Sequence, residues 1–192
     1  MGFLTVLECP RDGLFGGYLA LTFLGRPLEF RCTAPIKPNR AQQILYGSTL
    51  DPYLYGEQIG KTLLSGATIS PLVVFTDQSA ILAAGDCVDV PVVLVQTPTS
   101  EKEAQDTAGN QAEIPSSGSN GKTWRVHAAH APDFNLAHFR VGRNHLATIA
   151  RTENEQATIT ERLAGLTESF DLAEPFTRIR EAIEEARGGG GS

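Results

Sequence analysis

Alternation of apolar and polar residues along the first third of the chain predicts β-strands. Residues 3–9 (FLTVLEC) form a short apolar run, and residues 18–24 (YLALTFL) have the aromatic and β-branched content that strands favour. Every second residue of 28–32 (LEFRC) is apolar, so this segment has one apolar and one charged face. Residues 10–17 (PRDGLFGG) are rich in turn-forming residues. The pattern predicts three consecutive antiparallel strands.

Two helices are predicted after these strands. Asn39 opens the first helix and Gly47 ends it. Ser48 or Thr49 can cap the second helix, whose first turn contains Pro52. At the α-helical period of about 3.6 residues, one face of the second helix carries Leu50, Tyr53, Leu54, Glu57 and Leu64. Glu57 is thus predicted to be a carboxylate on an otherwise apolar face.

Residues 71–95 predict a parallel β-α-β unit. The segments 71–75 (PLVVF) and 90–95 (VPVVLV) are continuous apolar runs, typical of strands buried on both faces, and 78–84 form a short helix between them. A strand-helix-strand connection of this length crosses over the sheet, so we expect the two strands to be parallel. Asp77 lies at the tip of the first strand, where it can bind a metal or cap the next helix.

The remaining segments differ in composition. Residues 97–121 have no aromatic residue and hardly any apolar residue larger than Ala, which predicts a disordered linker after an α/β core at 1–96. Residues 152–187 contain two capping-box patterns ahead of amphipathic repeats and predict a helical hairpin that packs on the core or on a partner. Its expected apolar face comprises Ile159, Leu163, Leu166, Phe170, Leu172, Phe176, Ile179 and Ile183. GGGGS (188–192) is typical of an engineered flexible linker and is not counted in the fold.

Composition limits the function classes. The chain has 192 residues, 41% of them hydrophobic, which is enough for one core and an appended helical element. No run approaches the ~18 apolar residues of a membrane span, so we expect a cytoplasmic protein with no membrane partner. Cys9, Cys32 and Cys87 lie far apart without a CxxC pair, so neither a disulfide framework nor a zinc site is indicated, and small buried hydrophobic side chains are expected.

A basic segment contrasts with the overall net charge of -6. Residues 122–151 contain five basic residues and a single acidic one, Asp133, with aromatic residues interleaved. This pattern is typical of a surface that holds nucleic acid. The candidate nucleic-acid-binding residues are Lys122, Trp124, Arg125, Arg140 and Arg143. The alternative is that these charges are solvated or pair with the protein's own acidic helices.

Residues 3–96 resemble the ribonuclease H-like superfamily. Their element order, β-β-β-α-β-α-β, is that of the family, and GGYLALTFLGRPLEF (16–30) is similar to its second and third strands. PNR (38–40) is similar to the step that opens its first core helix. VVFTDQSAIL (73–82) looks like its fourth strand, which ends in Thr-Asp-Ser before a short helix. The resemblance implies an α/β fold with a mixed sheet of three antiparallel strands followed by a β-α-β unit.

The resemblance also implies carboxylates that hold two magnesium ions beside a scissile phosphate. Glu8 stands on the first strand, where the family has Asp, and Asp77 matches the tip of the fourth strand. The helix position falls on Gln42, a poor metal ligand, while the next helix offers Glu57; Asp133 is available for a late position. Hard cations prefer oxygen ligands, and paired metals about 3.5–4 Å apart bind both the attacking and the leaving oxygen. Glu8, Glu57 and Asp77 are therefore the candidate catalytic and metal-binding residues.

Each of these carboxylates also has an expected role that needs no metal. Asp77 can cap the following helix, because an Asp side chain accepts a hydrogen bond from a free backbone amide. Glu57 can pair with Lys61 one turn later. Glu8, at a strand end, can simply be solvated.

The incomplete carboxylate set favours a divergent, non-catalytic ribonuclease H-like domain that binds protein or nucleic acid without a cofactor. A protein partner is expected on the helical hairpin or the sheet, and a nucleic acid on residues 122–151. The alternative is a magnesium-dependent nuclease that uses Glu8, Glu57 and Asp77. A second alternative is a longin- or profilin-like adaptor, because those folds also combine an antiparallel meander with helices. Convergence of the three carboxylates is the geometric test.

Overall fold

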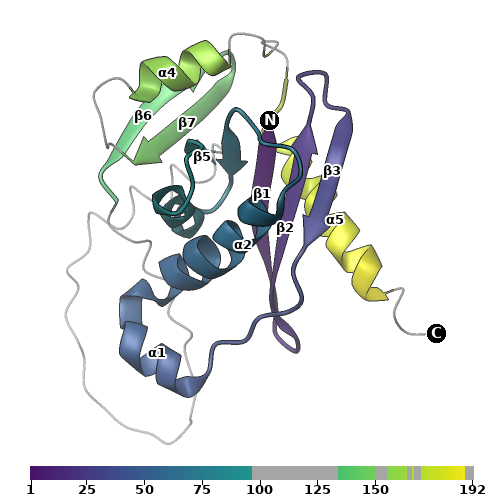
Figure 1. The fold of residues 1–192 in the computed structure, drawn as a ribbon, viewed down its shortest axis with the longest axis vertical. Helices are drawn as coiled ribbons and strands as arrows, with labels where there is room; N and C mark the ends of the chain where they lie inside the picture. The colour runs from purple at the N-terminus through teal and green to yellow at the C-terminus, as the bar shows by residue number, and fades with distance from the viewer. Residues whose placement is uncertain (97–133, 150–154, 164–165, 167–169, 189–192) are drawn as a thin grey trace, which may run out of the picture.

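The computed structural model describes residues 1–96, 134–149, 155–163, 166 and 170–188. In this part of the chain a mixed seven-stranded sheet, in the order β3-β2-β1-β4-β5-β7-β6, has helices on both faces (Figure 1). The predicted linker at 97–121 lies outside the described residues. The architecture is α/β, as predicted.

The strand directions follow the sequence pattern. β1 (Gly2–Cys9), β2 (Gly13–Leu21) and β3 (Pro27–Cys32) are antiparallel neighbours. β4 (Val74–Thr76) runs parallel to β1, and β5 (Val92–Gln96) runs parallel to β4. The antiparallel strands and the parallel pair that the sequence predicts are therefore present, with β4 starting later than expected.

β2 begins earlier than the residue pattern predicts. Gly16 and Gly17, which were predicted to belong to a turn, lie within this strand. A Cβ atom on Gly16 would lie 2.1 Å from Ile59 Cγ2, and one on Gly17 would lie 2.2 Å from Ile179 Cγ2. Adjacent strand residues point to opposite faces. The two glycines therefore let a helix approach the sheet closely on each side.

A hairpin extends the sheet beyond β5. β6 (Leu136–Val141) pairs with β7 (Asn144–Ile149), and β7 is antiparallel to β5. Gly142 has φ 57° in the two-residue loop, at the position where a type II′ turn needs glycine. This part of the predicted basic segment is therefore built into the sheet.

One face of the sheet is covered by helices from the middle of the chain. The short turn η1 (Gly47–Thr49) leads into the π-helix η2 (Pro52–Gly60), which is followed by α2 (Lys61–Gly66) and by the 3₁₀-helix η3 (Ser79–Asp86). Side chains from η2, α2 and η3 pack on β1, β2 and β4. No side chain caps η2, in contrast to the predicted Ser48 or Thr49 cap.

α1 (Arg40–Tyr46) precedes this layer. Its predicted cap is confirmed: Asn39 accepts a hydrogen bond from the Gln42 amide at 2.8 Å, and the Gln42 side chain accepts one from the Asn39 amide at 3.0 Å. This is a complete capping box.

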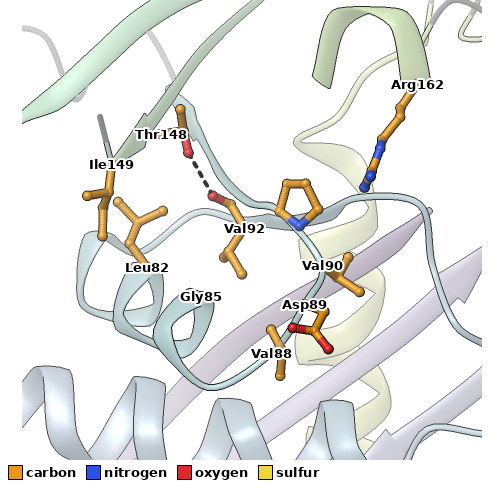
Figure 2. A pocket seen from close by; sticks show the side chains of 10 residues that line it. Leu82, Gly85, Val88, Asp89, Val90, Val92, Thr148, Ile149 and Arg162 are labelled. Atoms are coloured by element: carbon orange, nitrogen blue, oxygen red, sulfur yellow. Dashed lines mark hydrogen bonds between the residues drawn. The ribbon is translucent and has the colours of Figure 1, made fainter. Parts of the chain in front are cut away.

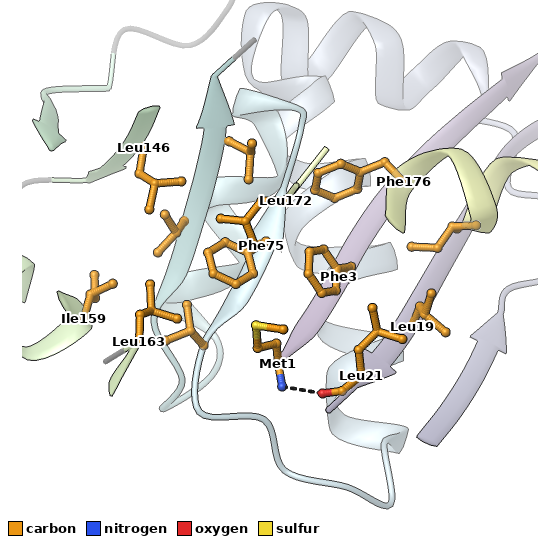
Figure 3. Packing of buried hydrophobic residues seen from close by; sticks show 14 of the residues in the cluster. Met1, Phe3, Leu19, Leu21, Phe75, Leu146, Ile159, Leu163, Leu172 and Phe176 are labelled. Carbon is orange, nitrogen blue, oxygen red and sulfur yellow. Dashed lines mark hydrogen bonds between the residues drawn. The ribbon is translucent and has the colours of Figure 1, made fainter. Parts of the chain in front are cut away.

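The opposite face carries the C-terminal helices. α4 (Glu155–Arg162) and α5 (Glu174–Gly188) follow β7 along the chain. Phe176 of α5 packs edge-on against Phe3, whose ring lies 5.3 Å from that of Phe75 (Figure 3). Six of the predicted apolar residues are buried, and Leu166 and Phe170 are partly buried against the same cluster. Residues on both sides of 97–133 thus share one core.

Two further expectations concern composition. Cys9 is buried, whereas Cys32 is exposed and Cys87 is half-buried, so only Cys9 has the expected environment. None of the helices in the described part of the chain combines the length and apolar character that crossing a bilayer requires.

Candidate functional site

Asp77 lies at the end of β4, where its carboxylate is held by two other elements. Thr5 of β1 donates its hydroxyl to Asp77 Oδ1 at 2.8 Å, and Arg180 of α5 forms an ion pair with Oδ2. The N-cap of η3 is Gln78, without a side-chain cap bond. The sequence allowed Asp77 to cap the next helix, but Asp77 does not cap η3. Its carboxylate instead holds α5 on the sheet.

Gln78 extends the pairing of β1 past the end of β4. Its side-chain oxygen accepts a hydrogen bond from the Val6 amide at 2.8 Å, and its side-chain nitrogen donates to the Val6 carbonyl at 3.0 Å. The side-chain amide thereby takes the place of a further β4 residue. No sequence pattern pointed to this role.

Glu8 lies on the other face of the sheet. It is three residues from Thr5 on β1, and side chains alternate between faces along a strand. Its carboxylate accepts a hydrogen bond from the hydroxyl of Tyr55 in η2. Burial, followed by this hydrogen bond, raises the pKa of Tyr55. Burial and the charge of Glu8 also raise the pKa of Asp51.

Glu57 is exposed, which corrects the prediction that it faces the core. The prediction assumed an α-helix, but η2 is a π-helix, whose hydrogen bonds span five residues. Leu54 and Ile59, five residues apart, are therefore both buried, and Glu57 turns outward. Its charge contributes to the raised pKa of Tyr46, after the larger effects of the Tyr53 hydrogen bond and burial. Sequence periodicity alone does not reveal a π-helix.

The three predicted carboxylates are therefore not brought together. Asp77 faces α5, Glu8 faces η2, and Glu57 lies on the outer surface of η2. Among the described residues, no three His, Cys, Asp or Glu side chains form a group that could hold a metal ion. The geometry offers no two-metal centre at these positions.

Only two of the five candidate nucleic-acid-binding residues lie in the described part of the chain. Lys122, Trp124 and Arg125 lie outside the described residues. Arg140 of β6 donates from Nε to the Gly142 carbonyl at 2.9 Å, and Arg143 lies 3.7 Å from Asp171. The two described arginines thus have contacts within the chain.

Two hollows flank the segment before β5, at the opposite end of the parallel strands from Asp77. The first, about 170 Å³, lies between η3, β5, β7 and Arg162, and Thr148 donates to the Val92 carbonyl at its wall (Figure 2). The second, about 340 Å³, shares Val88, Asp89 and Val90 with the first. Both are lined by polar as well as apolar groups, and no motif in the sequence indicated them.

Exposed apolar side chains gather on two elements. In α1 no residue is buried, and Ile44 and Leu45 are 70% and 81% exposed. On β3, at the edge of the sheet, Leu28 and Phe30 are 51% and 41% exposed. The sequence predicted an apolar face for β3 but not that this face would remain uncovered.

Comparison with known proteins adds no assignment. No protein-family model matches the chain, and no curated protein is significantly similar to it.

Proposed function

We propose that this chain is a non-catalytic α/β domain of the ribonuclease H-like type that binds a protein partner through α1. The order of elements from β1 to β5 supports the relationship, because it is the order that the resemblance implies. The observation that carries the binding role is the exposure of Ile44 and Leu45 on a helix with no buried residue.

The environment of Asp77 supports a non-catalytic role. Arg180 supplies at this carboxylate the positive charge that a metal ion would otherwise bring, and Thr5 occupies its second oxygen. Glu8, on the other face of β1, is bound by Tyr55. A two-metal mechanism needs carboxylates that converge on both ions. These side chains instead hold the layers of the fold together.

α1 is suited to present an apolar surface. A helix of seven residues is marginal in water, because nucleation is costly. The Asn39 and Gln42 capping box offsets part of this cost without any packing. Ile44 and Leu45 are adjacent and remain open to solvent. With the exposed Ala41 they follow the i, i+3, i+4 spacing by which an amphipathic helix inserts into an apolar groove of another protein.

A protein is a better candidate partner than a nucleic acid. The net charge of -6 opposes binding to a phosphate backbone, and both Arg140 and Arg143 already have contacts within the chain. An apolar groove, in contrast, would bury the exposed side chains of α1 and gain free energy in proportion to the apolar area removed from water.

A photoreactive amino acid placed at position 45 tests this function. In cells of the source organism, it should cross-link to a different protein, and the product should disappear when Ile44→Asp is added. The matched control is position 24, because Leu24 is 81% exposed, like Leu45, but lies outside α1. Equal labelling at both positions, or cross-linking only to another copy of the chain, would contradict the proposal.

A nuclease assay tests the non-catalytic role separately. The wild type should leave DNA, RNA and hybrid substrates intact in millimolar magnesium or manganese, and neither ion should raise the melting temperature. Asp77→Asn should behave in the same way in both measurements. Metal-dependent cleavage that Asp77→Asn abolishes would overturn the non-catalytic role and restore the nuclease alternative.

A further inference from the structure

β3 leaves backbone hydrogen-bonding groups at the edge of the sheet. It pairs with β2 on one side and ends the strand order on the other. The Thr33 amide donates to the Gly16 carbonyl at 3.0 Å, in register with the β2-β3 pairing. Backbone groups alternate in direction along an antiparallel strand, so those of Arg31 also point to β2. The N–H and C=O groups of Phe30 and Cys32 consequently point outward.

The side chains of β3 divide into an apolar and a charged face. Phe30 lies opposite Leu19, which belongs to the cluster covered by α5, yet Phe30 itself is 41% exposed. On the other face Glu29 accepts hydrogen bonds from the Thr68 and Ile69 amides at 3.0 Å and lies 3.5 Å from Arg31. Along the strand, Glu29 and Arg31 therefore precede and follow Phe30. Their opposite charges lie on one face of the sheet and the exposed aromatic ring lies on the other.

We propose that β3 of a second copy of this chain pairs antiparallel with this edge, with Phe30 on the twofold axis. In that register Phe30 opposes Phe30 of the second copy, and Glu29 opposes Arg31 of the second copy. The outward backbone groups of the two Phe30 residues exchange hydrogen bonds. An isologous contact of this kind closes a dimer instead of building a fibre.

The charges select this register over its neighbours. A shift by two residues in one direction places Glu29 opposite Glu29 of the second copy. The same shift in the other direction places Arg31 opposite Arg31 of the second copy. Like charges directly opposite each other destabilise a strand pair, and opposite charges stabilise it. A shift by one residue moves the side chains to the wrong face. Self-complementarity of this short sequence is the reason to infer a second copy as the partner.

The contact is limited in length, so the dimer is concentration-dependent. The pairing with β2 is irregular between Ala20 and Leu21, next to the start of β3, and Pro27 has no amide to donate. Such features shorten the usable edge of a strand. The pairing therefore centres on residues 29–31. This inference is independent of the partner proposed for α1, which lies on another element.

Sedimentation equilibrium tests the dimer. The wild type should show a reversible monomer-dimer equilibrium, and Phe30→Lys should weaken association by about tenfold or more, because two desolvated charges would meet on the axis. Leu45→Asp, on α1, should leave the equilibrium unchanged. A wild type that is monomeric at all concentrations, or a Phe30→Lys protein that is folded and dimerises normally, would overturn the proposal.

Cross-linking tests the register even where Phe30→Lys fails to fold. In a Cys32→Ser background, Phe30→Cys should form a disulfide-linked dimer, because residues directly opposite each other in a hydrogen-bonded pair have Cα atoms about 5.5 Å apart. Leu28→Cys in the same background should not, because residue 28 opposes residue 32 of the second copy. Cross-linking through Cys32 of the wild type without cross-linking through position 30 would overturn this register.

Discussion

Tyr18 is fully buried in β2, and the structure gives its hydroxyl no hydrogen-bond partner among the described residues. Burial, and to a smaller extent the charge of Glu29, raises the pKa of Tyr18 from 10.0 to about 12. A buried polar group without a partner costs stability, whereas an apolar replacement of the same shape removes that cost. Tyr18→Phe is therefore expected to be as stable as the wild type at neutral pH, or more stable by about 1 kcal/mol.

Ionisation of Tyr18 is also expected to lower the stability of the fold at alkaline pH. Because the pKa is higher in the folded chain than in the unfolded one, the neutral phenol favours folding below pH 10, and this contribution is lost as the pH rises toward 12. Urea unfolding between about pH 9 and pH 12, a range that includes the ordinary tyrosine pKa of about 10, should show a steeper loss of stability for the wild type than for Tyr18→Phe. If the wild type and Tyr18→Phe lost stability equally as the pH rises, the assigned role of Tyr18 would be wrong.

At this scale the sequence predicted positions better than roles. Asp77 was placed correctly at the tip of β4, but its partner Arg180 lies 103 residues later. The only local hint was that Arg180 follows the buried Phe176 by one helical turn and so borders the packed face of α5. Pairing between distant residues depends on the tertiary fold and cannot be obtained from local spacing.

At the scale of the elements, the close packing of α5 on the sheet depends on Gly17 in β2. A Cβ atom on Gly17 would lie 2.2 Å from Ile179 Cγ2 and 2.9 Å from Ile183 Cδ1. Because Cγ2 of a β-branched residue moves little, Gly17→Ala should push α5 from the sheet and cost about 1–3 kcal/mol. Gly188→Ala, where nothing lies within 4 Å, is the control. The urea midpoint of Gly17→Ala should fall, while the dependence of the unfolding free energy on urea concentration stays the same. An unchanged midpoint would contradict the close packing.

The elements that the sequence predicted well are those with a regular period. The apolar faces of α4 and α5 follow a period of about 3.6 residues, and their buried residues match the prediction. Glu57 was misplaced because η2 departs from the α-helical period. β6 and β7 were not predicted as strands, because residues 122–151, Arg140 of β6 among them, were interpreted by their basic charge and not by the alternation of apolar and polar residues.

At the scale of the whole molecule, strands from the first part of the chain and helices from the last part form one core. Leu172, Phe176, Ile179 and Ile183 pack in the same cluster as Phe3, Leu19 and Phe75 (Figure 3). Full burial of each such side chain contributes about 1.5–3 kcal/mol. Four of them together approach the total stability of a domain, which is about 5–15 kcal/mol.

A chain that ends at residue 170 is therefore expected to lose cooperative unfolding, because removing α5 exposes one face of β1 and β2 to water. Calorimetry of the full chain should show one transition with equal calorimetric and van't Hoff enthalpies, and the shortened chain should show none. A chain that ends at residue 188 is the control and should melt as the full chain does. If residues 1–170 melted cooperatively at the same temperature, the C-terminal helices would be a separate unit, as the division of the sequence at 96 and 152 suggested. The ion pair between Asp77 and Arg180 would then join two independent parts instead of two layers of one core.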